Sequence, residues 1–179
     1  EALKNYPQWM QISFEIALHH GVRLRAPQVQ LDRVHLDPAT TSTQNLDRIT
    51  FHQKGRNGVV KITTVPLHSA LRPLMLELKA SKAKFSCVLP AMASKEFWKF
   101  RRDHGFEHLR FHSTRATVAT ELARNNVSIQ KAKALLGHSS EAVHLAYLRL
   151  KAHDIADAVE TLSFGTPGGH ALTEKERSA

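Results

Sequence analysis

Apolar positions in the first part of the chain recur at the spacing of an amphipathic helix between Pro7 and Gly21. Proline suits a first helical turn and glycine suits a helix end, so the pattern predicts one helix between them. The polar and apolar mixture of residues 25–31 predicts a second, short helical piece.

The next apolar positions follow the spacing of strands. Residues 48–53 (RITFHQ) alternate between apolar and polar side chains, and residues 59–65 (VVKITTV) are rich in β-branched residues. The sequence GRNG at 55–58 separates them and is typical of a hairpin turn. Residues 34–36 (VHL) are a weaker strand candidate. We therefore expect a small antiparallel sheet, followed by a helix over 68–80 with a proline in its first turns.

From Ala93 onward the pattern is almost entirely helical. Helices are predicted within 94–105, 112–126 and 128–137, then in a segment that carries Tyr147, and finally over 152–162. Ser128 is a candidate cap, as are Ser139 and Ser140 for the next helix, and Gly137 is a natural helix end. Phe97 and Trp98 are expected in the core. The predicted fold class is α+β, mostly α-helical with a small antiparallel β-sheet, in one domain over 1–163 with a flexible tail over 164–179.

Composition narrows the choice of partner. The chain has 25 Lys and Arg against 16 Asp and Glu, a net charge of +9, which favours polyanions and nucleic acid first. Its single cysteine excludes a disulfide framework and a cysteine-based zinc site. No stretch approaches the roughly 20 apolar residues of a membrane span, so we expect a cytoplasmic protein with no membrane partner. The start at Glu1, without methionine, suggests that a segment is missing upstream.

Several residues have chemistry suited to a phosphodiester. His112 and Arg115 (HSTR) lie three apart near a predicted helix start, where free N–H groups attract anions. A planar cation beside a group that titrates near neutrality suits phosphoryl chemistry. Each residue also has an ordinary structural explanation: a surface His–Arg pair, a histidine that caps a helix at 138, and a packed ring at Tyr147.

The order of these residues resembles the catalytic domain of the tyrosine recombinase (phage integrase) family over roughly residues 5–160. An arginine follows a glycine at GVR (Arg23), a lysine precedes the hairpin turn (Lys54), and H-x-x-R is followed by LGH at 136–138. A tyrosine stands nine residues after that histidine. The matching positions are Arg23, Lys54, His112, Arg115, His138 and Tyr147.

The resemblance implies DNA strand cleavage and rejoining through a 3′-phosphotyrosyl intermediate, with no cofactor and no metal. It implies Tyr147 as nucleophile, Arg23, Arg115 and His138 as stabilisers of the phosphate, Lys54 as general acid and His112 as general base or proton shuttle. Lys61 is a rival for the lysine role. The family usually carries an acidic residue three positions after its first arginine, where this chain has Ala26.

The resemblance also implies double-stranded DNA as partner, a homotetramer on DNA that is possibly monomeric without it, and a nucleoid-associated location. We expect no counterpart of the family's N-terminal DNA-clamping domain within these residues. Residues 152–164 match a segment that docks on a neighbouring subunit, or else pack on their own core. Two alternatives are a type IB topoisomerase and a non-catalytic DNA-binding relative. We expect phosphate contacts from basic residues on two predicted helices: Lys95, Lys99, Arg101, Arg102, Lys131 and Lys133.

Overall fold

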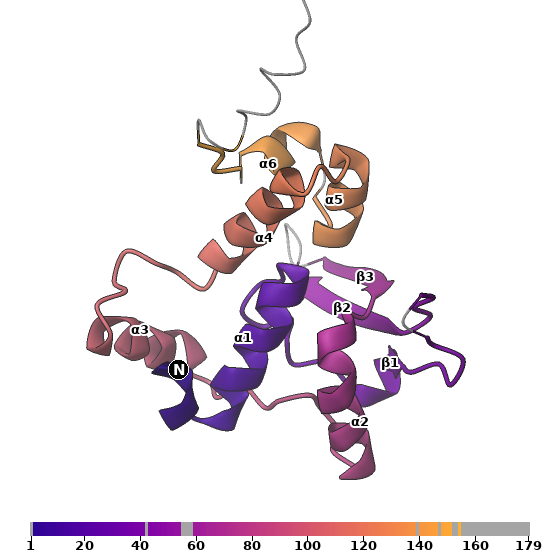
Figure 1. Cartoon of the computed structure of the whole chain (residues 1–179). Helices are drawn as coiled ribbons and strands as arrows, with labels where there is room; N and C mark the ends of the chain where they lie inside the picture. Colours follow the sequence, from indigo (N-terminus) through magenta and orange to yellow (C-terminus); the bar gives the residue numbers. More distant parts are fainter. Residues whose placement is uncertain are drawn as a thin grey trace, which may run out of the picture. The chain divides into compact units, whose positions relative to one another are not determined.

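The computed structural model describes residues 2–41, 43–54, 59–138, 140–146, 148–151 and 154 (Figure 1). By internal contacts the chain divides into residues 1–149 and 150–179, and the description below concerns the first unit. The fold is mostly helical with one small antiparallel sheet, which confirms the predicted class. Among the described residues, no helix is long and apolar enough to cross a bilayer.

Helix α1 (Gln8–His20) begins after Pro7 and ends at Gly21, as its sequence predicts. Met10, Ile16 and Ala17 are almost fully buried on its inner face. Gly21 has a φ of 60°, and its N–H donates to the carbonyl of Ala17 at 2.8 Å. This left-handed residue stops the helix and turns the chain toward Arg23.

The sheet has strand order β1-β2-β3, from β1 (Val34–His35), β2 (Arg48–Lys54) and β3 (Val60–Pro66). Ile49 pairs with Val65 in an antiparallel register, and all three strand predictions are confirmed. Since directly opposed residues share a face of the sheet, Phe51 and Thr63 lie on the buried face. Lys61 stands two positions before Thr63 on β3, so its side chain points to the same face of the sheet.

A buried ion pair fixes the loop that precedes β2. Asp47 is 1% exposed and its carboxylate accepts from the guanidinium of Arg72, from the backbone N–H of Asp37 and from the hydroxyl of Thr40. Burial alone would raise the pKa of Asp47, but these hydrogen bonds outweigh it and hold the pKa below its ordinary value. Arg72 opens α2 (Arg72–Ala80), which follows the 3-10 turn η4 (Ser69–Leu71).

Helix α3 (Ala93–Asp103) contributes aromatic rings to the core. Phe97 and Phe100 are buried, and the ring of Phe97 lies 5.3 Å from that of Phe14 on α1. The prediction that Trp98 joins them is wrong, because its side chain is 47% exposed and lies under the guanidinium of Arg102 at 4.8 Å. A residue next to Phe97 is turned about 100° around the helix, off the buried face.

The predicted helical piece over 25–31 is also wrong. Residues 24–27 form a turn, Gln30 makes a bridge with Phe85, and only the 3-10 turn η2 (Leu31–Arg33) follows. Pro27 disfavours helical backbone in the residue before it. The backbone of Val29 instead exchanges hydrogen bonds with Ser86, which binds this segment to a distant part of the chain.

Three helices complete the unit: α4 (Ser113–Arg124), α5 (Ile129–Leu136) and α6 (Glu141–Leu145). The predicted caps are confirmed: Ser128 accepts from the N–H of Lys131, and Gly137 ends α5 with a φ of 66°. Ser140 caps α6 by accepting from the N–H of Val143. Tyr147, the predicted helix over 152–162 as a whole and the tail over 164–179 lie outside the described residues, so the predicted domain end at 163 stays a prediction.

Candidate active site

A buried arginine joins the ends of two helices. Arg115, on the first turn of α4, is 2% exposed. Its Nη1 donates to the carbonyl of Gly21 at 2.8 Å, and its Nη2 donates to the carbonyl of Leu136, the last residue of α5. These carbonyls lie at the negative ends of α1 and α5, which stabilise a cation. The arrangement holds the guanidinium in one orientation.

A third hydrogen bond of Arg115 leads to two histidines. The Nε of Arg115 donates to Nε2 of His138 at 3.0 Å, and Nδ1 of His138 lies 3.0 Å from Nδ1 of His144 on α6. Both rings are buried, with 8% and 2% of their surface exposed. Burial, followed by the charge of Arg115, lowers the pKa of His138 to about 4, so the ring is neutral at pH 7.

Lys61 extends from β3 to the same place. Its Nζ donates to the carbonyl of Gly137 at 2.7 Å, next in sequence to His138. Its charge also contributes to the lowered pKa of His138. Lys54, the lysine favoured from the sequence, pairs with Val60 at the end of the β2–β3 ladder, and its side chain lies outside the described residues.

Arg23 and His112, like Lys61, are exposed. His112 precedes the first turn of α4, whose positive end carries no acidic residue. Burial, then the charges of Arg115 and Arg23, lower the pKa of His112. Arg23 acts in the same direction on His138. The four residues therefore lie within electrostatic range of one another, as their order in the sequence predicts.

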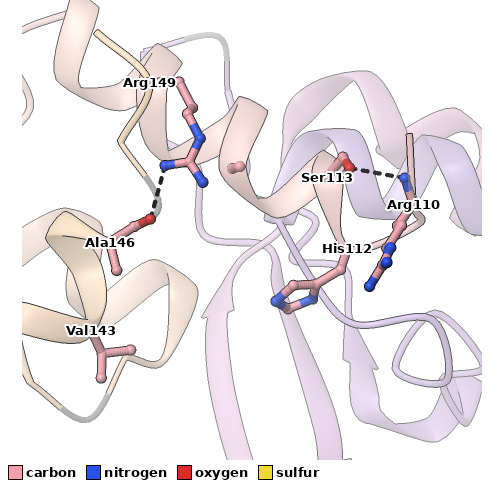
Figure 2. Close-up of a pocket in the computed structure, with 7 residues that line it drawn as sticks. Arg110, His112, Ser113, Val143, Ala146 and Arg149 are labelled. Atoms are coloured by element: carbon pink, nitrogen blue, oxygen red, sulfur yellow. Dashed lines mark hydrogen bonds between the residues drawn. The ribbon is translucent and has the colours of Figure 1, made fainter. Parts of the chain in front are cut away.

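An open cleft of about 420 Å³ lies beside His112. Figure 2 shows His112 projecting from the start of α4, with Arg110 on one side and Val143 and Ala146 on the other. Arg149 completes the rim, and its Nη1 donates to the carbonyls of Ala146 and Leu148. Two arginines, Arg110 and Arg149, thus line the cleft, which has room for a phosphate.

The sequence reasoning missed Arg110, Arg149 and His144. The first two stand two residues before His112 and two residues after Tyr147, so proximity to the motif was their only signal. His144 gave none, because its contact with His138 depends on how α6 folds back. Tyr147 itself lies outside the described residues, although Ala146 lines the cleft and Leu148 packs against Val118 and Leu136.

The basic residues expected to contact DNA have different surroundings. Lys95 and Lys99 are exposed on α3, and so is Lys131 on α5. Arg101 donates instead to the carbonyls of Glu107 and Leu109 and so ties down the loop after α3. Arg102 lies over Trp98, and Lys133 is half-buried on α5, where its charge lowers the pKa of His144.

Comparison with known families decides the relationship. A model of the phage integrase family matches residues 2–153. The chain belongs to the phage integrase family. Comparison with curated protein sequences gave no match. Ala26, where the family usually has an acidic residue, is 4% exposed and belongs to the hydrophobic core of this integrase-family chain.

Solved structures share the fold of this family member at low sequence identity. A XerH site-specific recombinase bound to palindromic difH substrate, in a post-cleavage complex, has a TM-score of 0.62 at 16% identity, over 84% of this chain and 44% of that one. A XerA recombinase has 0.58 at 16%, over 89% and 58%. A Tn1549 transposon integrase in complex with transposon right end DNA has 0.56 at 15%, over 90% and 62%. The chain therefore spans about half the length of these structures.

Proposed function

We propose that this chain is the catalytic domain of a site-specific DNA recombinase that cuts and rejoins DNA through Tyr147. The observation that carries the proposal is that the charges of Arg23, Arg115 and Lys61 all act on His138. The charges of Arg115 and Arg23 also act on His112, which lines the open cleft. These three cations and the two neutral histidines, His112 and His138, suit a reaction that adds negative charge to a phosphate.

The reaction divides strand exchange into two transfers. The hydroxyl of Tyr147 attacks a backbone phosphorus, the bond from phosphorus to the 5′-oxygen breaks, and a 3′-phosphotyrosyl link forms. A 5′-hydroxyl from another strand later reverses the step and frees the tyrosine. Because the covalent link conserves the bond energy, the cycle requires no nucleotide.

The roles of the site residues follow from their charge and proton state. Arg23 and Arg115 stabilise the non-bridging oxygens, and His138 adds a hydrogen bond. His112 accepts the proton of the tyrosine, which its lowered pKa permits because the ring is neutral at pH 7. The leaving 5′-oxygen requires a proton, and a lysine donates it.

The contact of Lys61 with Gly137 supports Lys61 over Lys54 for that proton donor. Nζ of Lys61 lies 2.7 Å from the carbonyl of Gly137, so the ammonium is beside the histidine that contacts the phosphate. We therefore assign the general-acid role to Lys61 and keep Lys54 as the comparison variant.

The substrate is double-stranded DNA, held by phosphate contacts from the exposed cations of α3 and α5. The Tn1549 integrase structure is a complex with transposon right end DNA, and the XerH structure is bound to its difH substrate, which supports this substrate class. Recombination between two duplexes requires four such domains, so we propose a homotetramer on DNA. Binding of this kind weakens as salt rises, since each neutralised phosphate releases counterions.

Covalent capture tests the proposal without knowledge of the target site. The purified chain is incubated with nicked duplexes whose sequence is randomised around the nick, so that the cleaved fragment diffuses away and traps the adduct. We expect a protein–DNA band on a denaturing gel that Tyr147→Phe abolishes. Tyr6→Phe, at the other tyrosine of the chain, is the matched control and retains the band.

Two outcomes would replace the proposal. Salt-sensitive DNA binding with no adduct from any member of the pool would make the chain a non-catalytic DNA-binding relative. An adduct accompanied by relaxation of supercoiled plasmid, but no exchange between two duplexes bearing the captured sequence, would make it a topoisomerase.

A further inference from the structure

His144 belongs to none of the motifs that led to the site, yet it is buried as deeply as Arg115. Its ring is 2% exposed and lies 5.2 Å, between centroids, from the ring of His138. The two Nδ1 atoms are 3.0 Å apart, which is hydrogen-bonding distance. One of these two nitrogens therefore carries a proton and the other accepts it.

The bond from Arg115 reveals which nitrogen is the donor. The Nε–H of a guanidinium can only donate, so Nε2 of His138 is an acceptor and has no proton. A neutral imidazole carries one proton, which for His138 must then be on Nδ1. It follows that His138 donates from Nδ1, and that His144 accepts at Nδ1 and carries its own proton on Nε2.

We propose that His144 is a positioning residue that keeps the proton of His138 on Nδ1 and so directs Nε2 toward Arg115 and the phosphate. The part that concerns the phosphate rests on the function proposed above. His144 does not touch the substrate in this scheme; it acts through His138, much as an outer hydrogen-bond partner fixes the tautomer of a catalytic histidine.

The same bond has a role when DNA binds. A phosphate oxygen at Nε2 can accept a hydrogen bond only after that nitrogen gains a proton from solvent, which ends its bond from Arg115 while Gly21 and Leu136 still hold the guanidinium. His138 is then a cation that donates from both nitrogens, to the phosphate and to His144. Arg115, Arg23 and Lys61 oppose this charge, and the negative phosphate offsets them. His144 is the acceptor in both states, so its ring need not move.

Two nearly isosteric substitutions separate hydrogen bonding from packing. His144→Leu removes the acceptor, whereas His144→Asn places Oδ1 where Nδ1 of the histidine stood, two bonds from Cβ. Leucine and asparagine share the same heavy-atom skeleton, with two δ atoms on Cγ, so the difference between the two variants reports on the acceptor. Thermal unfolding checks that both variants fold.

The first measurement is the nitrogen NMR spectrum of the histidine rings in the DNA-free chain, with His138→Gln used to assign the signals of His138. We expect Nδ1 of wild-type His138 to be the protonated nitrogen. Asn at 144 keeps this tautomer, and Leu at 144 shifts the His138 signals toward a mixture.

The second measurement is the single-turnover rate of adduct formation on the duplexes that covalent capture selects. Loss of a buried acceptor leaves the N–H of His138 unsatisfied, so we expect His144→Leu to slow cleavage by roughly 10-fold or more. DNA affinity stays within about twofold, because no phosphate contact is removed, and His144→Asn recovers most of the rate.

The proposal is overturned if wild-type His138 carries its proton on Nε2, if the Leu variant leaves the His138 signals and the rate unchanged, or if Asn is as defective as Leu. Failure of the wild-type chain to form any adduct refutes the proposed function instead. The nitrogen spectra still decide the tautomer in that case, so the two failures are distinguishable.

Discussion

Alanine in place of Gly21 tests the joint between α1, α4 and α5. Gly21 has a φ of 60°, and a Cβ built on it would lie 2.3 Å from Cδ2 of Leu136 and 3.3 Å from Cβ of Val118. Contacts below 3.0 Å force a displacement, and Leu136 is 1% exposed in a packed cluster, so its side chain has little room to move.

The expected cost has two parts. A left-handed backbone costs a non-glycine residue about 1 kcal/mol. Overpacking a well-filled core costs a further 1–3 kcal/mol, roughly. The free energy of unfolding should therefore fall by about 2–4 kcal/mol, which lowers the melting temperature by about 5–15 °C for a domain of this size. Cleavage should fall as well, since the carbonyl of Gly21 holds Nη1 of Arg115.

Thermal and chemical unfolding of Gly21→Ala and Gly105→Ala measure the two parts separately. Gly105 has a φ of 70°, and a Cβ there meets nothing within 4 Å, so its alanine variant carries only the backbone cost. Equal destabilisation of the two variants would refute the reasoning, because it would mean that the contact with Leu136 is relieved at no cost.

Three further predictions follow from the site and the core. Lys61→Met should slow cleavage by roughly 100-fold or more. A substrate with sulfur as the leaving 5′-atom needs no proton and should restore the rate of this variant. If Lys54→Met slows cleavage, the sulfur substrate should not restore its rate. His20 is buried and neutral, with burial as the main cause that lowers its pKa from 6.5 to about 4. Between pH 6.5 and about pH 4 the unfolded chain thus binds a proton at His20 that the folded chain does not. As the pH falls from 7 to 5, His20 should therefore lower the free energy of unfolding by about 2 kcal/mol. Denaturant titrations at the two pH values should show a smaller loss for His20→Gln, and an equal loss would exclude this cause. Arg72→Met should destabilise the fold by about 3 kcal/mol, because it leaves the charge of Asp47 unpaired. Adding Asp47→Asn should recover part of the lost stability. A double variant less stable than Arg72→Met would contradict this explanation.

Local signals predicted much of the fold. Gly21, Ser128 and Gly137 end or begin helices through bonds to residues a few positions away, so the sequence around each is sufficient. The segment over 25–31 could not be predicted in this way, because its backbone partners include Ser86, far along the chain. The prediction for Trp98 was wrong because α3 carries four apolar or aromatic positions, which leave the buried face of the helix ambiguous.

The candidate site was predictable as a set of residues but not as a network. The order of Arg23, His112, Arg115 and His138 is visible in the sequence, and the structure brings these four into electrostatic range. Which lysine reaches the site depends on the register of β2 and β3 and on the end of α5. The bond from His138 to His144 depends on the turn between α5 and α6. Such contacts arise from tertiary structure and leave no periodic pattern.

The way in which Arg115 is held has a consequence for its charge. Among the described residues, the groups that accept from its three nitrogens are two peptide carbonyls and a neutral imidazole. A carboxylate in the same place would orient the guanidinium but would also cancel its field. These neutral acceptors orient the guanidinium without cancelling its charge, which acts on His112 and His138. Rigidity and electrostatic strength, which usually compete at a buried arginine, are here obtained together.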